Sequence, residues 1–402
     1  MTDRLGAVIG GVDTHKDLHV AAVVDEAGRI QGTASFPANA NGYGQLERWM
    51  RSFGTLQRVG VEGTGAYGAG LARHLAEVDV AVVEVNRPNR QMRRRRGKND
   101  TVDAEAAARA ALNGEAQGQP KAKDGLVESI RVLRIAFCSA RDARTRIANQ
   151  IRDLVLTAPD QLRQALEPLE TAQRVARAAR FRPGELTDPL EATRAALRSL
   201  ARRYQNLTTD LAELREQLDA LTTQANPALR AAKGVGPDVA SILLIAAGDN
   251  PDRLHSDAAF AALCGASPIE ASSGRTVRHR LNRGGNRQAN HALWRIVMTR
   301  LATDPATRAY AERRRAEGKT TKEITRCLKR YIARDVYNLL TKTRHVPNTT
   351  DLRPARLAAG LTLTDIATQL GTWPARISEL ERGRSRNDDL ETNYRAWLSQ
   401  VA

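Results

Sequence analysis

Residues 7–13 of the chain read AVIGGVD, and this stretch decides how the first part of the chain folds. A short apolar run that ends in an acid is typical of a buried strand with a carboxylate at its end. Residues 18–24 and 29–36 have the same extended character, and Ala27-Gly28 supplies a turn between them. We therefore predict a sheet that begins with three consecutive strands.

Helix and strand signals then alternate along the chain. Residues 42–53 place apolar side chains at helical spacing, and residues 58–62 form a short strand pattern that ends in Glu62. Asn99 or Asp100 can cap a helix that runs through residue 108. The other predicted elements are a helix over 66–76 and a strand over 78–85. The order β-β-β-α-β-α-β-α predicts an α/β sheet domain over residues 1–115.

The remainder of the chain is predicted to be mainly helical. Residues 126–225 are rich in Ala, Arg, Leu, Gln and Glu, and the segment FRPGELTDP at 181–189 interrupts them as a turn. Leucines at spacings of four and three favour a coiled-coil region, although the core of a plain helical bundle gives the same pattern. These leucines are Leu207, Leu211, Leu214, Leu218 and Leu221. Linkers over 114–125 and 346–350 set off a mainly α domain at 226–345 and a small all-α domain at 351–402.

The charge of the chain is large and unevenly spread. Its 402 residues include 62 Lys and Arg against 45 Asp and Glu, a formal net charge of +17. Residues 271–345 alone hold 19 basic and five acidic residues, a net charge of +14. Like charges at this density repel one another unless a polyanion neutralises them, which favours contact with nucleic acid. A second basic run is a weaker candidate, because such runs often decorate loops; it comprises Arg93, Arg94, Arg95, Arg96 and Lys98.

Several classes of protein are excluded. The longest apolar run, Ile242 to Ala247, is far too short to cross a membrane. The N-terminus lacks the cationic and apolar regions of a secretory signal. The three cysteines, Cys138, Cys264 and Cys327, are far apart and form no CxxC, so we expect no disulfide framework and no zinc knuckle. A reducing compartment such as the cytoplasm fits this cysteine usage.

Four acids form a candidate metal site. Asp13 and Glu62 each end a predicted strand of one sheet, and Asp100 and Asp103 share one face at the start of a helix. Any one of them alone is more often a helix cap or a surface residue. Together, in a basic protein, they favour Mg²⁺ or Mn²⁺, because clustered carboxylates repel unless a cation neutralises them. Two such ions can activate a nucleophile and stabilise the leaving oxygen in phosphoryl transfer.

Three segments carry a family resemblance. GVDTHK at 11–16, VEGTGAY at 61–67 and KNDTVDA at 98–104 resemble the DEDD transposases of bacterial insertion sequences, the IS-one-ten family, which is related to the Piv-type DNA invertases. The resemblance spans roughly residues 6–340, with the middle matched by helical character only. It implies a RuvC-like, RNase H-type fold for the first domain and a metal-binding catalytic role for the four acids. Asn99 and Gly63 depart from the usual Thr and Ala, and neither position is a carboxylate.

The third domain offers a candidate nucleophile. GVGP at 234–237 has the form of a helix-hairpin-helix turn, in which Gly234 and Gly236 would let the backbone approach a phosphate, although a plain inter-helix turn fits equally well. Ser272 and Ser273 precede a glycine in what is usually a simple turn. Placed between that hairpin and a cluster of arginines, they become candidate nucleophiles. The arginines of this cluster are Arg275, Arg278, Arg280, Arg283 and Arg287.

The resemblance also implies a mechanism. The family carries a similar Gly-x-Gly-Pro, Ser-Gly and basic Gly-Asn segment, which assigns the nucleophile to Ser273, with Ser272 as the alternative because the register of two adjacent serines is ambiguous. The serine and the metal-bound acids would act together across the subunits of a dimer or tetramer. They would form a covalent phosphoserine link to DNA and rejoin strands without net hydrolysis. A structured RNA from the same element would guide the reaction, with Arg93–Arg96 and the coiled-coil region as candidate contacts.

The last 50 or so residues resemble a helix-turn-helix of the Cro and lambda-repressor type. Ile366 and Ala367 are expected in the core, and Thr372 is expected to cap the recognition helix. The candidate contacts to the major groove are Arg376, Ser378 and Glu379, and Arg382 would contact phosphate. This module is not a standard part of the transposase family. It would bind the element's ends or promoter, or serve as a protein-interaction domain.

Three functions fit the sequence. The first is a metal- and serine-dependent transposase or site-specific recombinase. The second is a RuvC-like nuclease that hydrolyses DNA and needs no serine. The third is a DNA-binding regulator with a decayed catalytic domain, against which the presence of all four acids and the serine argues.

Overall fold

The computed structural model describes residues 6–85, 99–116, 118–275, 279–342, 348–383 and 387–401. The chain forms two compact units. The first comprises Met1–Lys123 and Asn250–Arg253, and the second comprises Asp124–Asp249 and Leu254–Ala402. The first unit is mixed α/β and the second is mainly helical. None of the helices in the described ranges is long and apolar enough to cross a bilayer.

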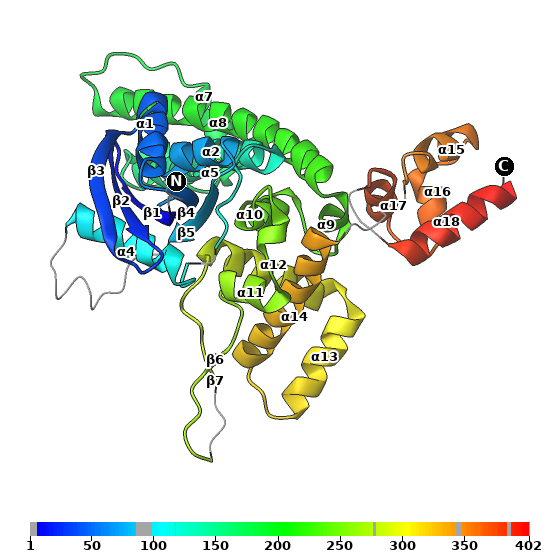
Figure 1. Cartoon of the computed structure of the whole chain (residues 1–402). Helices are drawn as coiled ribbons and strands as arrows, with labels where there is room; N and C mark the ends of the chain where they lie inside the picture. The colour runs from blue at the N-terminus through cyan, green and yellow to red at the C-terminus, as the bar shows by residue number, and fades with distance from the viewer. Residues whose placement is uncertain are drawn as a thin grey trace. The chain divides into compact units, whose positions relative to one another are not determined.

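The first unit is built on a five-stranded sheet of order β3-β2-β1-β4-β5 (Figure 1). β1, β2 and β3 pair antiparallel in sequence order, whereas β4 runs parallel to β1 and β5 runs parallel to β4. The predicted α/β sheet is therefore confirmed. The strands are β1 (Ala7–Thr14), β2 (Leu18–Asp25), β3 (Ile30–Pro37), β4 (Thr55–Glu62) and β5 (Ala81–Val85).

Helices cover both faces of this sheet, and alternation along β1 decides which side chain meets which helix. Val8 and Val12 pack in the core formed with α1 (Ala40–Arg51) and α2 (Ala69–Glu77), whereas Ile9 packs against α4 (Asp100–Leu112). Gly11 points to the α4 side, where an added Cβ would lie 2.1 Å from the amide nitrogen of Ala108. A glycine at this position is what allows the helix backbone to lie directly on the strand.

Two elements of this unit begin later than predicted. α2 begins at Ala69 rather than at residue 66, because residues 63–68 form a turn. β5 begins at Ala81 rather than at residue 78, because Asp79 has a left-handed backbone with φ of 56°. Asn99, not Asp100, caps α4 by accepting a hydrogen bond from the Thr101 amide. The basic run Arg93–Arg96 and Lys98 lies outside the described residues.

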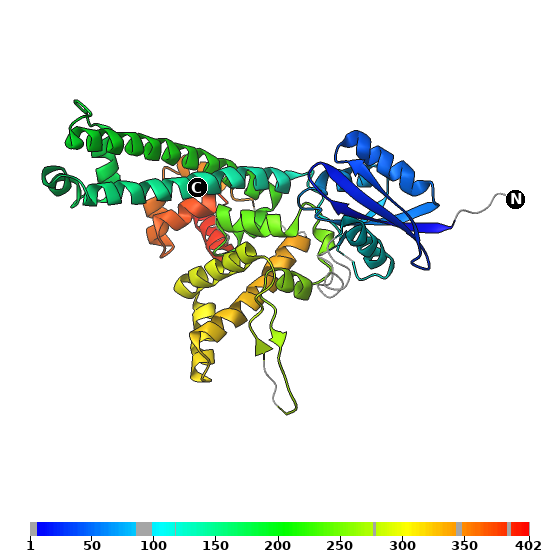
Figure 2. The same ribbon diagram turned by 90° about the vertical axis from the view of Figure 1, so that its left-hand side faces the viewer.

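The second unit contains a pair of long helices, α5 (Leu126–Leu156) and α8 (Pro189–Ala225), which lie side by side (Figure 2). The predicted interruption is a turn between α7 and α8. Two short helices that were not predicted, α6 (Asp160–Leu166) and α7 (Thr171–Ala179), come before it. Their apolar side chains join α5 and α8 in one core, represented by Ile151, Leu166 and Leu197. Of the leucine repeat, Leu211 and Leu218 are buried.

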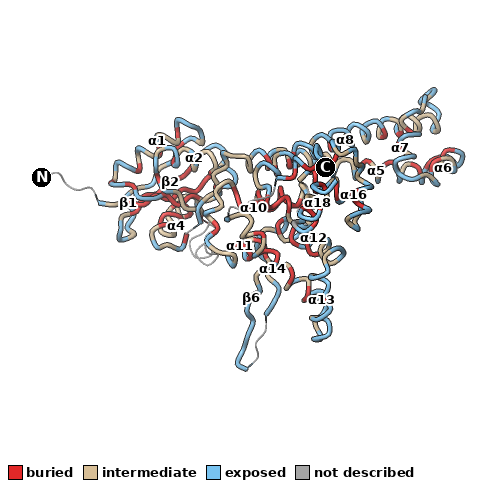
Figure 3. The backbone as a smooth tube through the Cα atoms, turned by 90° about the vertical axis from the view of Figure 1, so that its right-hand side faces the viewer, coloured by how far each residue is buried: buried red, intermediate tan, exposed pale blue. Residues whose placement is uncertain are grey.

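A helical body follows, with the almost fully buried α10 inside it (Figure 3). Its apolar sequence explains its place: eight of its 11 residues are buried. The GVGP turn leads directly into it, with Gly234 at φ of 87°. The body contains α9 (Pro227–Ala231), α10 (Pro237–Ala247), α11 (Asp257–Leu263), α12 (Arg287–Thr303), α13 (Pro305–Ala316) and α14 (Thr321–Thr341).

A long two-stranded arm projects from this body (Figure 1). Its short strands β6 (Ile269–Glu270) and β7 (His279–Arg280) pair antiparallel. We expected a loop here, and the pairing of β6 with β7 holds the two ends of that loop together. The described residues between the two strands, 271–275, are all exposed.

Four short helices at the end of the chain have a core of their own. Ile366, Ile377 and Tyr394 are fully buried in it. The buried ion pair between Arg356 and Glu381, 2.7 Å between Nε and Oε1, is completed by a hydrogen bond from the Tyr394 hydroxyl. The predicted cap was wrong: Trp373, not Thr372, occupies the N-cap of α17 and supplies no side-chain hydrogen bond. The helices are α15 (Leu352–Ala358), α16 (Leu363–Gln369), α17 (Pro374–Glu381) and α18 (Asp388–Val401).

Candidate active site

The candidate site begins with the direction of Asp13. Alternation along β1 places Asp13 on the same side as Ile9 and Gly11, which is the side covered by α4. The first turn of α4 carries Asp100 and Asp103. Because Gly11 lets α4 lie close to β1, these carboxylates gather at the end of the strand. Asp13 and Asp103 are both buried.

His15, which was not among the predicted site residues, joins this cluster. His15 Nε2 lies 3.3 Å from Asp13 Oδ2 and 3.4 Å from Asp100 Oδ2. A signal for it was present, since side chains two residues apart at a strand end point the same way. One ligand atom from each of Asp13, His15 and Asp100 lies within 4.8 Å of the others.

Burial and neighbouring charge act on Asp13 in opposite senses. Burial raises the pKa of Asp13, the nearby His15 lowers it, and the carboxylates of Asp103 and Asp100 raise it again, with a net increase from the ordinary value of 3.8. The charged form of this carboxyl group is therefore under-compensated by the protein's own side chains. A bound cation would supply the missing positive charge, so these residues fit a divalent metal.

Glu62 lies at the same end of the neighbouring strand. β4 runs parallel to β1 in a register that pairs Val61 with Val12, so Glu62 ends its strand beside Asp13. The Thr14 hydroxyl donates a 2.8 Å hydrogen bond to the Glu62 carbonyl oxygen and ties the two strand ends together. The Glu62 side chain is half-buried. The sequence-predicted acids thus come from β1, β4 and α4 to one edge of the sheet.

The candidate serines lie in the other compact unit. Ser272 and Ser273 are exposed on the β6–β7 arm. The four described arginines of the predicted cluster are exposed on and beside the arm, and Arg278 lies outside the described residues. The four are Arg275, Arg280, Arg283 and Arg287. An exposed hydroxyl flanked by exposed guanidinium groups is accessible to a phosphodiester.

A side-chain brace at its base holds the arm on the helical body. Asn290 of α12 donates hydrogen bonds to the carbonyl oxygens of Cys264 (2.8 Å) and Gly265 (3.0 Å). Lys329 of α14 donates a 2.9 Å hydrogen bond to the same Asn290. Gly285 crosses so close to Gly265 that an added Cβ would lie 2.6 Å from the Gly265 nitrogen. The sequence alone does not reveal this brace, because its partners are 25 to 39 residues apart.

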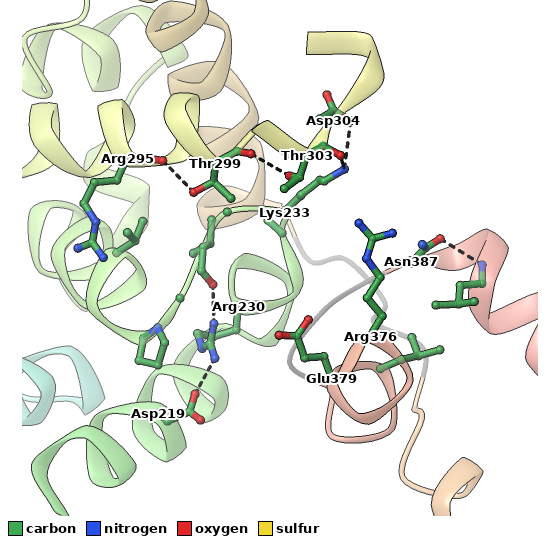
Figure 4. A pocket seen from close by; sticks show the side chains of 18 of the residues that line it. Asp219, Arg230, Lys233, Arg295, Thr299, Thr303, Asp304, Arg376, Glu379 and Asn387 are labelled. Carbon is green, nitrogen blue, oxygen red and sulfur yellow. Dashed lines mark hydrogen bonds and ion pairs between the residues drawn. The ribbon is translucent and has the colours of Figure 1, made fainter. Parts of the chain in front are cut away.

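A cavity of about 1060 Å³ collects other predicted nucleic-acid contacts (Figure 4). Gly234 and Gly236 of the GVGP turn and Arg376 of α17 all line it. Several cations in its wall are paired with acids: Arg230 with Asp219 at 2.6 Å, Lys233 with Asp304 at 3.5 Å, and Arg295 with Asp238. These pairs hold the turn in place and lower the net positive charge of the wall. Ser378 is partly buried and Arg382 is exposed.

These features define a class of protein. A sheet edge with clustered carboxylates that fits a divalent cation, in a chain that also carries a strongly basic helical unit, is characteristic of proteins that act on nucleic acid. Comparison with known proteins agrees. A DEDD-type model described as a transposase matches residues 10–158, and a model described as the transposase of the IS116/IS110/IS902 family matches residues 226–312.

The two matches together cover more than half of the chain, which belongs to the IS110 family of transposases. A curated relative from Streptomyces coelicolor is described as an uncharacterised 43.6 kDa protein of insertion element IS110. It is 34% identical over 128 residues, which are 29% of this chain. The match spans 31% of the length of that relative.

Proposed function

We propose that this protein is an insertion-sequence transposase that cuts and rejoins DNA with a metal-bound acidic site and a serine nucleophile. The observation that carries the proposal is the convergence of Asp13, Asp100 and His15 at one sheet edge, with Glu62 on the adjacent strand end. The family to which the chain belongs supports DNA as the substrate.

The proposal includes a RuvC-like, RNase H-type fold for the first unit. The sheet order β3-β2-β1-β4-β5 supports it, with three antiparallel strands followed by two parallel ones. In this arrangement β1 is central, so its last residues lie where a neighbouring strand and α4 meet. Asp13 is therefore held by the most constrained strand of the sheet.

The four acids Asp13, Glu62, Asp100 and Asp103 would hold magnesium or manganese, with two ions expected. When bound, such ions supply charge stabilisation for the attacking and leaving oxygens of a phosphodiester. The chain's own carboxylates fix the position of this positive charge. The α4 backbone contributes as well, since the helix N-terminus favours the negative charge of Asp100 and Asp103.

Ser273, or Ser272 beside it, would act as the nucleophile. Its Oγ attacks the phosphorus of a DNA phosphodiester, a P–O bond to the sugar breaks, and the proton lost by the serine ends on the released sugar hydroxyl. A second sugar hydroxyl then attacks the phosphoserine ester, which restores both a phosphodiester and the serine. No water enters, so strands are exchanged without net hydrolysis.

Nucleic-acid contacts complete the proposal. The exposed arginines of the arm would bind DNA phosphates, and α15–α18 would form a Cro-like helix-turn-helix that binds the element's ends. A structured RNA from the element is the proposed guide, with Arg93–Arg96 and the coiled-coil pair α5 and α8 as its contacts. We expect a homo-oligomer, because two or more strands must be cut and rejoined. We also expect the protein to work at the nucleoid in the cytoplasm.

Substitution of the serines tests this proposal. The protein is incubated with DNA from its own element ends, Mg²⁺ and co-expressed element RNA, and the products are separated by denaturing electrophoresis. We expect a covalent protein–DNA adduct from the wild type and from Ser272→Ala, and none from Ser273→Ala. Nearly complete loss is expected, because alanine has no atom that can form the ester.

The other outcomes separate the competing functions. Nicked DNA without an adduct from the wild type would identify a RuvC-like nuclease. Binding without any cleavage would identify a DNA-binding regulator. An adduct from Ser273→Ala that is lost in Ser272→Ala would move the nucleophile by one residue.

A further inference from the structure

His15 is the side chain of the candidate site to which the proposed function assigns no role. Its Nε2 atom is shielded from solvent and has no hydrogen-bond partner of ordinary geometry among the described residues. Yet it lies 3.3 and 3.4 Å from carboxylate oxygens of Asp13 and Asp100. Charge-assisted hydrogen bonds between such groups are shorter, about 2.7–2.9 Å. The nitrogen therefore faces both carboxylates at distances longer than those of strong charge-assisted hydrogen bonds.

The spacing suits a shared cation better than a hydrogen bond. Adjacent ligand atoms around an octahedral ion with bonds of about 2.1 Å lie about 3 Å apart, and a slightly larger ion separates them further. The three atoms are held by two elements of the fold. Asp13 lies within β1 and His15 directly follows the end of that strand, whereas Asp100 lies in the first turn of α4. A ligand set held by a strand and a helix is already arranged before any ion binds.

We propose that His15 is a nitrogen ligand to the catalytic metal and that it biases the site toward Mn²⁺ over Mg²⁺. This inference rests on the proposed metal site of the transposase. Mg²⁺ prefers an all-oxygen shell, whereas imidazole nitrogen suits first-row transition ions. The set of Asp13, Asp100 and His15 is mixed, so replacing the nitrogen by oxygen removes the bias and leaves the carboxylates in place.

Mn²⁺ alone is the probe, titrated into the purified full-length protein without nucleic acid. The loss of the free-ion electron paramagnetic resonance signal gives the Kd, and electron spin echo modulation detects a nitrogen bound to Mn²⁺. For the wild type we expect nitrogen modulation and tighter binding of Mn²⁺ than of competing Mg²⁺. His15→Asn is expected to lose the modulation, weaken Mn²⁺ binding by about tenfold and narrow the preference over Mg²⁺.

Two matched variants keep the result interpretable. His255→Asn removes an exposed histidine of the second unit and is expected to behave as the wild type. Asp13→Asn removes a carboxylate and is expected to abolish tight Mn²⁺ binding. Circular dichroism of each variant shows whether it is folded.

The outcomes separate this inference from the proposed function. Wild-type Mn²⁺ binding by Asp13→Asn would refute the acidic metal site itself. Binding that depends on Asp13 but shows no nitrogen modulation would refute only the role of His15. Tighter binding by His15→Asn would also refute it, because His15 would then be a positive group that the metal must displace.

Discussion

The charged form of Asp13 is disfavoured by burial and by the two neighbouring carboxylates of Asp103 and Asp100. Its pKa is raised in the folded protein, so the folded state binds a proton more tightly than the unfolded chain does. The stability that this carboxyl group contributes is therefore fully present below its unfolded pKa and is lost as the pH rises through its folded pKa. The candidate site is thus assembled at a cost to the metal-free protein, as is common where function sets the residue.

Asp13→Asn should raise the stability of the metal-free protein at neutral pH, because the amide carries no charge to be buried. The melting temperature of the variant should exceed that of the wild type at pH 7, and the difference should shrink toward pH 4 as Asp13 becomes protonated. Differential scanning calorimetry with a chelator present measures both. An unchanged difference across this pH range would contradict the assignment of the effect to Asp13.

At the scale of elements, the contact between β1 and α4 decides whether the site can form. Asp13 lies on one of these elements and Asp100 and Asp103 on the other, and Gly11 sets their separation. The Cβ of any other residue at position 11 would overlap backbone atoms of α4, which have little freedom to move.

Gly11→Ala should therefore destabilise the protein by about 1–3 kcal/mol, the usual cost of overpacking, and should also weaken Mn²⁺ binding. Gly6→Ala is the control, since nothing lies within 4 Å of the Cβ that it would add. Urea unfolding followed by circular dichroism gives the free energy of unfolding. Equal stability of the two variants would show that α4 can shift away from β1 at little cost.

The sequence predicted those elements whose signals are local. Local patterns predicted the strand that contains Asp13, the strand that ends in Glu62 and the helix that Asn99 or Asp100 can cap. These elements carry the four acids at one edge of the sheet. The Asn290–Lys329 brace was not readable, because it depends on side chains that meet only after the helices pack. The cap at Thr372 failed because Pro374 fixes the first helical position and leaves the cap to Trp373.

At the scale of the whole molecule, the structure divides the basic charge into two kinds. Part of it is paired within the helical body, where Arg300 contacts Asp335 at 3.2 Å and Arg330 contacts Asp257 at 2.9 Å. By contrast, residues 271–287 contain five arginines and no acid. The arm and its base thus carry basic charge that no acid of the same segment offsets.

This division predicts the salt dependence of DNA binding. The slope of log K against log salt concentration is negative, and each lost phosphate contact should reduce its magnitude by about 0.9. Arg283→Ala should show this decrease, whereas Arg182→Ala, an exposed arginine between α7 and α8, should keep the wild-type slope. Fluorescence anisotropy with duplex DNA at several salt concentrations measures both slopes. Identical slopes for all three proteins would place the DNA elsewhere.

Gly265 and Gly285 cross at the base of the arm, and this crossing affects which insertions and deletions the protein can tolerate during evolution. The chain leaves the helical body and returns to it at nearly the same point, so the segment between these glycines is a closed excursion from the core. Residues can be inserted into it or removed from it without altering the packing of α10, α12 or α14. The length of the arm is therefore free to evolve independently of the stability of the body that carries it.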